Sequence, residues 1–191
     1  MVDVMRFTEI EHKFVVDDGF DLAAFGRALD ALGPIGRTTV QVRDRYFLTD
    51  DGREKRYVIR HRFDVELHQL TIKSLAADPE VRDEITLDLS RQEDFQVAQV
   101  DAFMGRMGVA WSGELKKDLD VWYFPDCEVV HYVASGGERT VRCVEFEATD
   151  KPSLPAALAT LDRYERATGF AGAPRSLRSL VDLLFPGIFG P

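Results

Sequence analysis

The stretch Glu9-Ile10-Glu11-His12-Lys13 lies within an alternating segment, residues 4–16, that sets the pattern for the rest of the chain. In a β-strand, side chains two apart share one face, and each step of two covers about 6.6–6.8 Å. A strand here lines up two carboxylates and one ammonium on one face, while Ile10 and Phe14 occupy the other. The charged face of a single strand ordinarily meets water. In this chain, however, the same arrangement recurs in several strands.

The composition is that of a globular protein. The chain has 191 residues, of which 45% are hydrophobic and 30% charged. These values suit one domain, so we expect a single domain over residues 1–191 with its core at about 4–185. A net charge of −9 argues against an extended nucleic-acid or anionic-membrane surface, because phosphate backbones require a basic footprint.

Two further observations bear on the compartment. No apolar run approaches the about 20 residues that span a bilayer, and residues 1–6 lack the features of a secretory signal. Cys127 and Cys143 form no CxxC pair, so we expect them to be reduced and structural. The sequence therefore predicts a soluble cytoplasmic protein.

The chain alternates between strand-like and helix-like periods. Strands are expected over residues 4–16, 38–48, 56–63, 67–75, 81–89, 109–124, 127–133 and 140–148, the sixth with a possible break near 112–113. Helices are expected over 22–32, 93–107, 153–168 and 176–185, with Asp21 and Ser153 at the starts of the first and third. Asp50-Asp51-Gly52 and Ser135-Gly136-Gly137 are turn signals.

The amphipathic helices and the charged strand faces together favour a closed sheet. The helices need an apolar sheet face to cover. If they cover the outside of a closed sheet, the charged faces of the strands must point into its lumen. The expected fold class is therefore α+β, with about eight strands forming a barrel and the helices packed outside.

Such a lumen would hold charges of both signs. The acidic candidates are Glu9, Glu11, Glu84, Asp88, Glu145 and Glu147. The basic candidates are Lys13, Arg60, Arg62, Lys73, Arg82 and one or both of Lys116 and Lys117. The two sets could simply neutralise each other as salt bridges. Alternatively, the carboxylates suit Mg²⁺ or Mn²⁺, and the arginine and lysine side chains suit a polyphosphate.

The order and spacing of these residues resemble those of a known family, the CYTH domains or triphosphate tunnel metalloenzymes. The resemblance runs in order over about residues 7–184. It rests on Glu9-x-Glu11-x-Lys13, Arg43-Asp44-Arg45-Tyr46-Phe47-Leu48-Thr49, Ile59-Arg60-His61-Arg62, Leu70-Thr71-Ile72-Lys73, Arg82-Asp83-Glu84, Val144-Glu145-Phe146-Glu147 and Pro174-Arg175-Ser176-Leu177. The sequence departs from the family pattern at Leu48, Thr86, Glu114–Asp118 and the approach to the last strand, Glu128–Arg142.

The resemblance implies an eight-stranded antiparallel tunnel that binds a small triphosphate with a divalent metal, and a monomer or homodimer. The implied metal ligands are Glu9, Glu11, Glu145 and Glu147. The implied phosphate-binding residues are Lys13, Arg43, Arg60, Arg62, Lys73, Arg82 and Lys117. Glu84 and Lys13 are the catalytic candidates, Glu84 for positioning the attacking water.

Four functions remain open from the sequence. The first is metal-dependent hydrolysis of inorganic, thiamine or nucleoside triphosphate. The second is class IV-type cyclisation of ATP to cyclic AMP, although no residue marks an adenine or ribose contact. The others are a binding module without turnover and a structural barrel with an ion-paired lumen. His12 and His61 fall on faces opposite the charged ones and are expected to be packing or surface residues.

Overall fold

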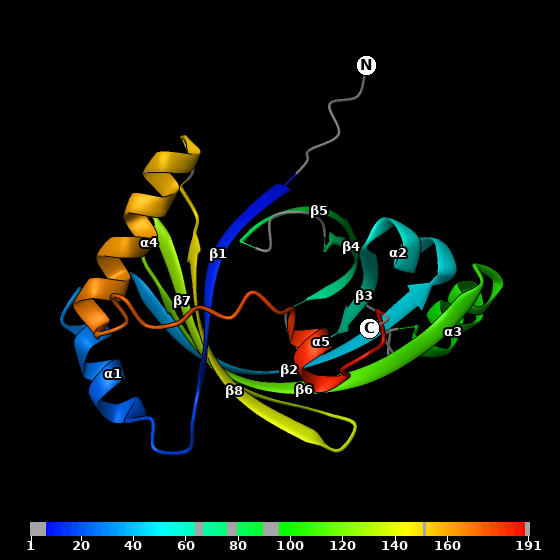
Figure 1. Ribbon diagram of the computed structural model, residues 1–191, viewed down its shortest axis with the longest axis horizontal. Helices are drawn as coiled ribbons and strands as arrows, with labels where there is room; N and C mark the ends of the chain where they lie inside the picture. The colour runs from blue at the N-terminus through cyan, green and yellow to red at the C-terminus, as the bar shows by residue number, and fades with distance from the viewer. Residues whose placement is uncertain (1–6, 64–66, 76–79, 90–95, 151, 190–191) are drawn as a thin grey trace.

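The computed structural model describes residues 7–63, 67–75, 80–89, 96–150 and 152–189. Eight antiparallel strands form a closed barrel in the order β1-β5-β4-β3-β2-β6-β7-β8 (Figure 1). They are β1 (Phe7–Val16), β2 (Gly36–Thr49), β3 (Tyr57–Phe63), β4 (His68–Ser74), β5 (Val81–Asp88), β6 (Val109–Tyr123), β7 (Cys127–Gly136) and β8 (Arg139–Ala148). The helices are α1 (Leu22–Asp30), α2 (Asp50–Lys55), α3 (Val97–Arg106), α4 (Leu154–Thr168) and α5 (Leu180–Leu184).

The first strand closes the barrel because it has a different partner along each half. Phe7 to Ile10 pair with β5, and Glu11 to Val16 pair with β8. Its apolar face turns outward, toward α4, and its charged face turns into the barrel. The predicted α+β barrel with helices outside its wall is confirmed.

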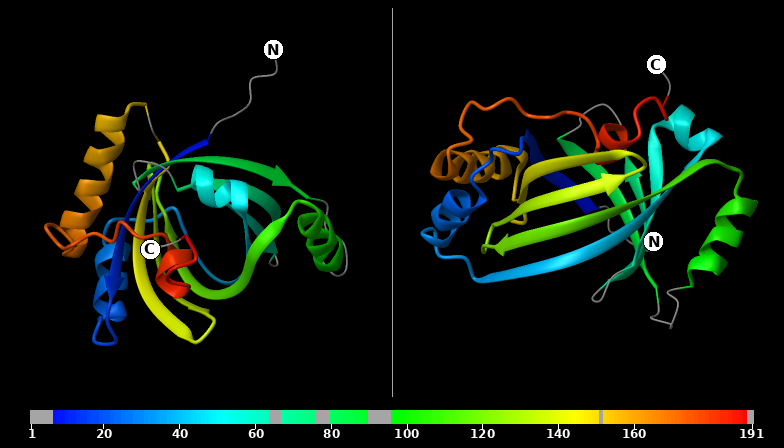
Figure 2. Two further views of the ribbon diagram at one scale, coloured as in Figure 1. Left: turned by 45° about the vertical axis from the view of Figure 1, so that its right-hand side comes forward. Right: turned by 90° about the horizontal axis from the view of Figure 1, so that it is seen from below.

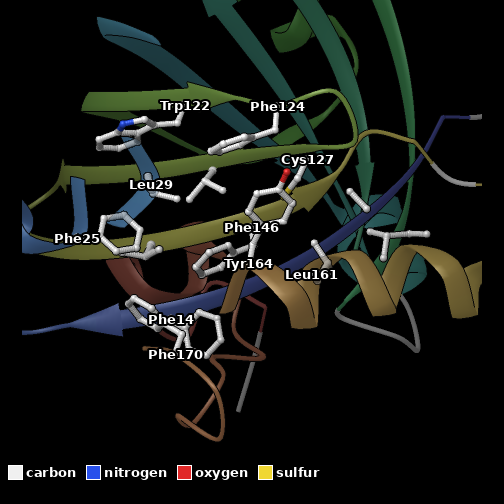
Figure 3. Packing of buried hydrophobic residues seen from close by; sticks show 14 of the residues in the cluster. Phe14, Phe25, Leu29, Trp122, Phe124, Cys127, Phe146, Leu161, Tyr164 and Phe170 are labelled. Carbon is white, nitrogen blue, oxygen red and sulfur yellow. The ribbon is translucent and has the colours of Figure 1, made fainter. Parts of the chain in front are cut away.

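Helices α1 and α4 lie outside the barrel (Figure 2), and an aromatic core fills the space between them and the outer face of the sheet (Figure 3). Phe14 and Phe146 meet edge to face, with ring centroids 5.8 Å apart, and Phe170 packs on both. Leu161 of α4 is fully buried in the same cluster. Aromatic pairs in this geometry contribute about 0.5–1.5 kcal/mol beyond the burial of their area. This core fixes β1 against α4 from behind.

A second apolar cluster fills one end of the barrel interior. Leu180, Val181 and Leu184 of α5 pack against inward-facing residues that include Leu48 and Tyr132. Helix α5 therefore covers apolar side chains that the barrel wall alone leaves exposed at this end. The remaining part of the interior carries the charged residues. Within the described residues, no helix is long and apolar enough to cross a membrane.

Several local expectations are confirmed and others are wrong. Asp21 and Ser153 cap α1 and α4 by accepting hydrogen bonds from Ala24 N and Ala156 N. The expected turn at residues 50–52 is instead the start of α2, because the Thr49 hydroxyl accepts a hydrogen bond from Gly52 N and nucleates a short helix.

Three boundaries also differ from expectation. Strand β6 runs unbroken through residues 112–113, since its pairing with β2 continues there. Gly136 belongs to β7, so the hairpin loop is Gly137-Glu138, with Gly137 at a φ of 57°. Helix α5 starts later than predicted because Ser179 caps it. Part of the expected third helix, residues 93–95, lies outside the described residues.

Two helical glycines give opposite predictions for Gly→Ala substitution. A Cβ at Gly52 would lie 2.8 Å from the carbonyl oxygen of Tyr57, whereas a Cβ at Gly105 would meet nothing within 4 Å. We expect Gly52→Ala to lower the free energy of unfolding by about 1–3 kcal/mol, because backbone must move. Gly105→Ala should raise it by up to about 1 kcal/mol. Urea unfolding measures both, and shifts of the same sign would contradict the described packing at Gly52.

Candidate active site

The charged faces of the strands converge on one cavity inside the barrel, of about 140 Å³. Alternation along each strand brings the side chains there, because residues two apart share a face. Its described lining includes six cations: Lys13, Arg60, Arg62, Lys73, Arg82 and Lys117. It also includes five glutamates: Glu9, Glu11, Glu128, Glu145 and Glu147. The expected lumen set is therefore largely brought together.

Strands β1 and β8 hold four of these glutamates side by side. Glu11 lies opposite Glu147, and Lys13 opposite Glu145. The Lys13 ammonium sits between two carboxylates, 3.4 Å from Glu11 Oε1 and 3.1 Å from Glu145 Oε1. Tyr132 of β7 donates a hydrogen bond of 2.8 Å to Glu145. This side of the cavity is thus acidic, with one embedded lysine.

The two glutamates of β1 respond to this environment in opposite directions. Burial raises the pKa of Glu11, but Lys13, Lys73 and Arg82 outweigh it and hold that pKa well below its usual range. For Glu9, burial and the neighbouring Glu11 carboxylate raise the pKa despite the attraction of Lys73. Of these two adjacent carboxylates, Glu11 therefore ionises more readily than Glu9.

A second group of contacts joins β1, β4 and β5. The Lys73 ammonium lies 2.6 Å from Glu9 Oε2 and 2.8 Å from Glu84 Oε1, and Arg82 Nη1 donates to Glu11 Oε1 at 2.5 Å. Glu84 therefore faces the lumen, next to Lys73, and Arg60 Nη2 lies 4.0 Å from its Oε2. Burial raises the pKa of Glu84, but the charges of Lys73 and Arg60 lower it by more than burial raises it. This carboxylate is therefore ionised at neutral pH.

The third group centres on Asp44 of β2, which is fully buried. Arg62 donates to both of its oxygens, Nε to Oδ1 at 2.8 Å and Nη2 to Oδ2 at 2.9 Å. The Lys117 ammonium lies 3.0 Å from Oδ2. Lys117 thus faces the lumen, and its neighbour Lys116 is exposed on the other face.

The placement of Arg43 differs from expectation. It is exposed on the outer face of β2, because alternation turns Asp44 inward and its neighbours outward. The expectation that Arg43 binds phosphate in the lumen is therefore wrong. Asp88 shares the inner-face register of Glu84 but is exposed, and it accepts a hydrogen bond from Gln69.

Three inward-facing residues were not among the candidates from the sequence: Asp44, Glu128 and Tyr132. The alternation of each strand shows which residues share a face with them. Asp44 shares a face with Tyr46, and Glu128 shares one with Val130 and Tyr132. In these strands apolar residues occupy both faces, so the pattern alone does not mark the inner one.

The histidines face away from the lumen, as expected for His12 and His61. His12 Nδ1 contacts Glu165 Oε1 of α4, and Arg175 donates to the other oxygen of Glu165 at 3.4 Å. His61 and His68 lie with their Nε2 atoms 3.0 Å apart. On the outside of the barrel, these contacts join β1 to α4 and β3 to β4.

The donor chemistry of the acidic side suits a hard divalent cation. Four carboxylates from two adjacent strands supply oxygen ligands of the kind Mg²⁺ and Mn²⁺ prefer. Burial and the adjacent Glu11 carboxylate raise the pKa of Glu9, so a cation bound beside it would favour its ionised form. In the described part of the chain, however, no three His, Cys, Asp or Glu side chains are close enough to share an ion. Lys13 lies between Glu11 and Glu145, so these carboxylates fit a metal only after Lys13 moves aside.

Solved structures with the same fold include three that cover most of the chain. The PH1012 protein from Pyrococcus horikoshii OT3 has a TM-score of 0.71 and 17% identity, over 92% of this chain and 99% of that one. An adenylate cyclase candidate from Bacillus halodurans has a TM-score of 0.65 and 20% identity, over 94% of this chain and 98% of that one. The Hippeastrum protein HpAC1 is described as having a dominant triphosphatase activity. Its structure has a TM-score of 0.55 and 16% identity, over 92% of this chain and 94% of that one.

At these identities the similarity concerns the fold. Among curated proteins, none matches the chain in sequence. The CYTH domain family, in contrast, matches residues 8–154, which contain β2 to β8, all of β1 except Phe7, and every lumen cation described above. The chain belongs to the CYTH domain family.

Proposed function

We propose that this protein is a metal-dependent hydrolase of a small triphosphate. The observation that carries the proposal is a cavity inside the barrel in which six cations face a row of glutamates. Buried cations are costly unless an anion compensates them. A triphosphate chain brings several negative charges within a short, flexible length, which matches cations presented from β1, β3, β4, β5 and β6.

The cations would bind the non-bridging phosphate oxygens. Arg60 and Arg62 carry planar guanidinium groups that can donate two parallel hydrogen bonds to one phosphate. Lys13, Lys73, Arg82 and Lys117 would complete the set. Since phosphoryl transfer develops charge on the equatorial oxygens, fixed donors of this kind stabilise the transition state.

The carboxylates Glu9, Glu11, Glu145 and Glu147 would hold the divalent ion. A bound Mg²⁺ or Mn²⁺ supplies charge neutralisation at the phosphoryl oxygens. The chain's own part is an exchange of partners. Lys13, Lys73 and Arg82 now contact these carboxylates or Glu84. When they turn to phosphate oxygens, the carboxylates are freed for the cation. Metal and triphosphate would therefore bind cooperatively.

Glu84 is the candidate that orients the attacking water. Its lowered pKa keeps it an ionised hydrogen-bond acceptor at neutral pH, and Lys73 fixes its position. Lys13 contacts two of the proposed metal ligands, Glu11 and Glu145, and would stabilise charge where the bond breaks.

Glu11→Gln tests the carboxylate role. We expect kcat for tripolyphosphate hydrolysis with Mg²⁺ to fall by about 10²–10³-fold, as when one electrostatic group is removed from other active sites. EDTA should abolish the wild-type activity. The matched control is Glu114→Gln, which makes the same change at an exposed position on β6. Equal turnover in Glu11→Gln and wild type would refute the role of Glu11.

Arg60→Ala tests the phosphate-binding role. Loss of one charged hydrogen bond costs about 1.5–3 kcal/mol, so the Kd for tripolyphosphate should rise roughly 10- to 100-fold. Isothermal titration calorimetry in the presence of EDTA measures the Kd without turnover. Arg106→Ala, at an exposed position in the last turn of α3, is the control and should bind as wild type. Similar affinities for the two variants would contradict the assignment of Arg60.

The substrate is identified by comparing products from tripolyphosphate, thiamine triphosphate and ATP, each with Mg²⁺ and with Mn²⁺. Phosphate release from one of them supports hydrolysis and names the preferred substrate. Cyclic AMP from ATP without phosphate release would replace the proposal with a cyclase. Binding without either product would indicate a binding module.

A further inference from the structure

Asp44 occupies a position in the cavity that neither the metal ligands nor the water-orienting residue explain. Both of its oxygens are engaged by cations: Arg62 donates to Oδ1 and Oδ2 at 2.8 and 2.9 Å, and Lys117 lies 3.0 Å from Oδ2. Its side chain is fully buried. These three residues, Asp44, Arg62 and Lys117, are called the Asp44 cluster below.

The Asp44 cluster differs from the other ion pairs of the lumen. Lys13, Lys73 and Arg82 pair with glutamates that would bind metal or orient water, so they must change partners when ligands arrive. Asp44, in contrast, is assigned neither to metal binding nor to orienting water. With both oxygens occupied and no exposed surface, it offers no site to a metal ion or to water.

The geometry also shows why an anion is needed here. Arg62 from β3 and Lys117 from β6 approach each other across β2, and two like charges repel in a buried site. A carboxylate between them neutralises one charge, so the cluster keeps a net charge of +1. The bidentate contact between Asp44 and Arg62 also fixes the plane of the Arg62 guanidinium.

We propose that Asp44 is a positioning residue that holds Arg62 and Lys117 together as a preassembled phosphate-binding pair. The proposal rests on the proposed triphosphatase function. Because this pair is held by a residue outside the metal site, it binds one part of the triphosphate before the other cations exchange partners. Asp44 thereby lowers the conformational entropy that the side chains of Arg62 and Lys117 lose on binding.

Asp44 also controls whether Lys117 is charged. Lys117 faces Asp44 and Tyr46 from β2, Arg60 and Arg62 from β3, and Tyr132 from β7, whose ring centroid is 5.9 Å away. Glu128 of β7 lines the same cavity, where the charge of Arg62 acts on it. Burial and Arg62 lower the pKa of Lys117 to about 8, and Asp44 opposes them. Without the Asp44 charge, Lys117 would lose its proton at a lower pH.

The first experiment measures the pKa of Lys117 directly. Protein carrying ¹³Cε-labelled lysine is titrated by NMR, and the Lys117 signal is assigned by its absence in Lys117→Arg. We expect about 8 for wild type and a value lower by about 1 unit or more for Asp44→Asn, since an opposite charge at this distance shifts a pKa by about 1–3 units. Asp118→Asn, which alters an exposed carboxylate on the outer face of β6, is the matched control.

The second experiment measures tripolyphosphate hydrolysis with Mg²⁺ across pH. In Asp44→Asn we expect KM to rise about 10-fold, kcat to change less, and the basic limb of kcat/KM to move to lower pH. Asp44→Glu, which keeps the charge, should restore the position of the limb. Asp118→Asn should match wild type. A uniform loss of activity at all pH values, with the limb unmoved, would make Asp44 merely structural and overturn the proposal.

An independent variant covers the case in which Asp44→Asn does not fold. Arg62→Gln removes the like charge and keeps Asp44, so the pKa of Lys117 should rise above the wild-type value. A fall or no change overturns the proposal. The NMR titration needs no turnover, so the two hypotheses can fail separately. If the pKa shifts as expected but wild type neither binds nor hydrolyses tripolyphosphate, the proposed function is wrong, and with it the phosphate role of the pair.

Discussion

The structure depends on the compensation of buried charge around β1. This strand closes the barrel between β5 and β8, and closure forces Glu9, Glu11 and Lys13 into the interior. Buried charges of this kind are tolerated only when partners of opposite sign and hydrogen bonds surround them. The arginine and lysine side chains of β3, β4 and β5 supply those partners. Removing the charges from water also strengthens every interaction among them.

The same compensation explains how a barrel interior can be both stable and reactive. Each cation on the acidic side has a glutamate partner, which stabilises the closed barrel without ligands. In the proposed function, a polyanion would replace the glutamates as partners of the cations, and a divalent cation would replace the cations as partners of the glutamates. The apolar cluster under α5 contributes a dry boundary on one side of the charged cavity.

The sequence predicted the barrel and most of the lumen because charged and apolar residues alternate cleanly in β1, β3 and β5. It failed where a strand is apolar on both faces. In β2, the family pattern includes Arg43 beside Asp44, and only the register with β3 and β6 settles which of them turns inward. The helix α2 was missed for a local reason: a threonine cap outweighs the turn signal of Asp50-Asp51-Gly52. The barrel fold and the division of residues between charged and apolar strand faces are thus encoded by local alternation. The partner of each charged side chain depends on the register between strands.

The position of β1 also has a kinetic consequence. Glu11 pairs with Glu147, 136 positions later in the chain. During synthesis the first strand emerges long before its partner, so the barrel cannot close until β8 has been made. Contacts this distant in sequence carry a large loop-closure entropy and slow folding. Until closure, the glutamates of β1 remain solvated and the cavity does not exist, so the site and the complete fold form in the same late step.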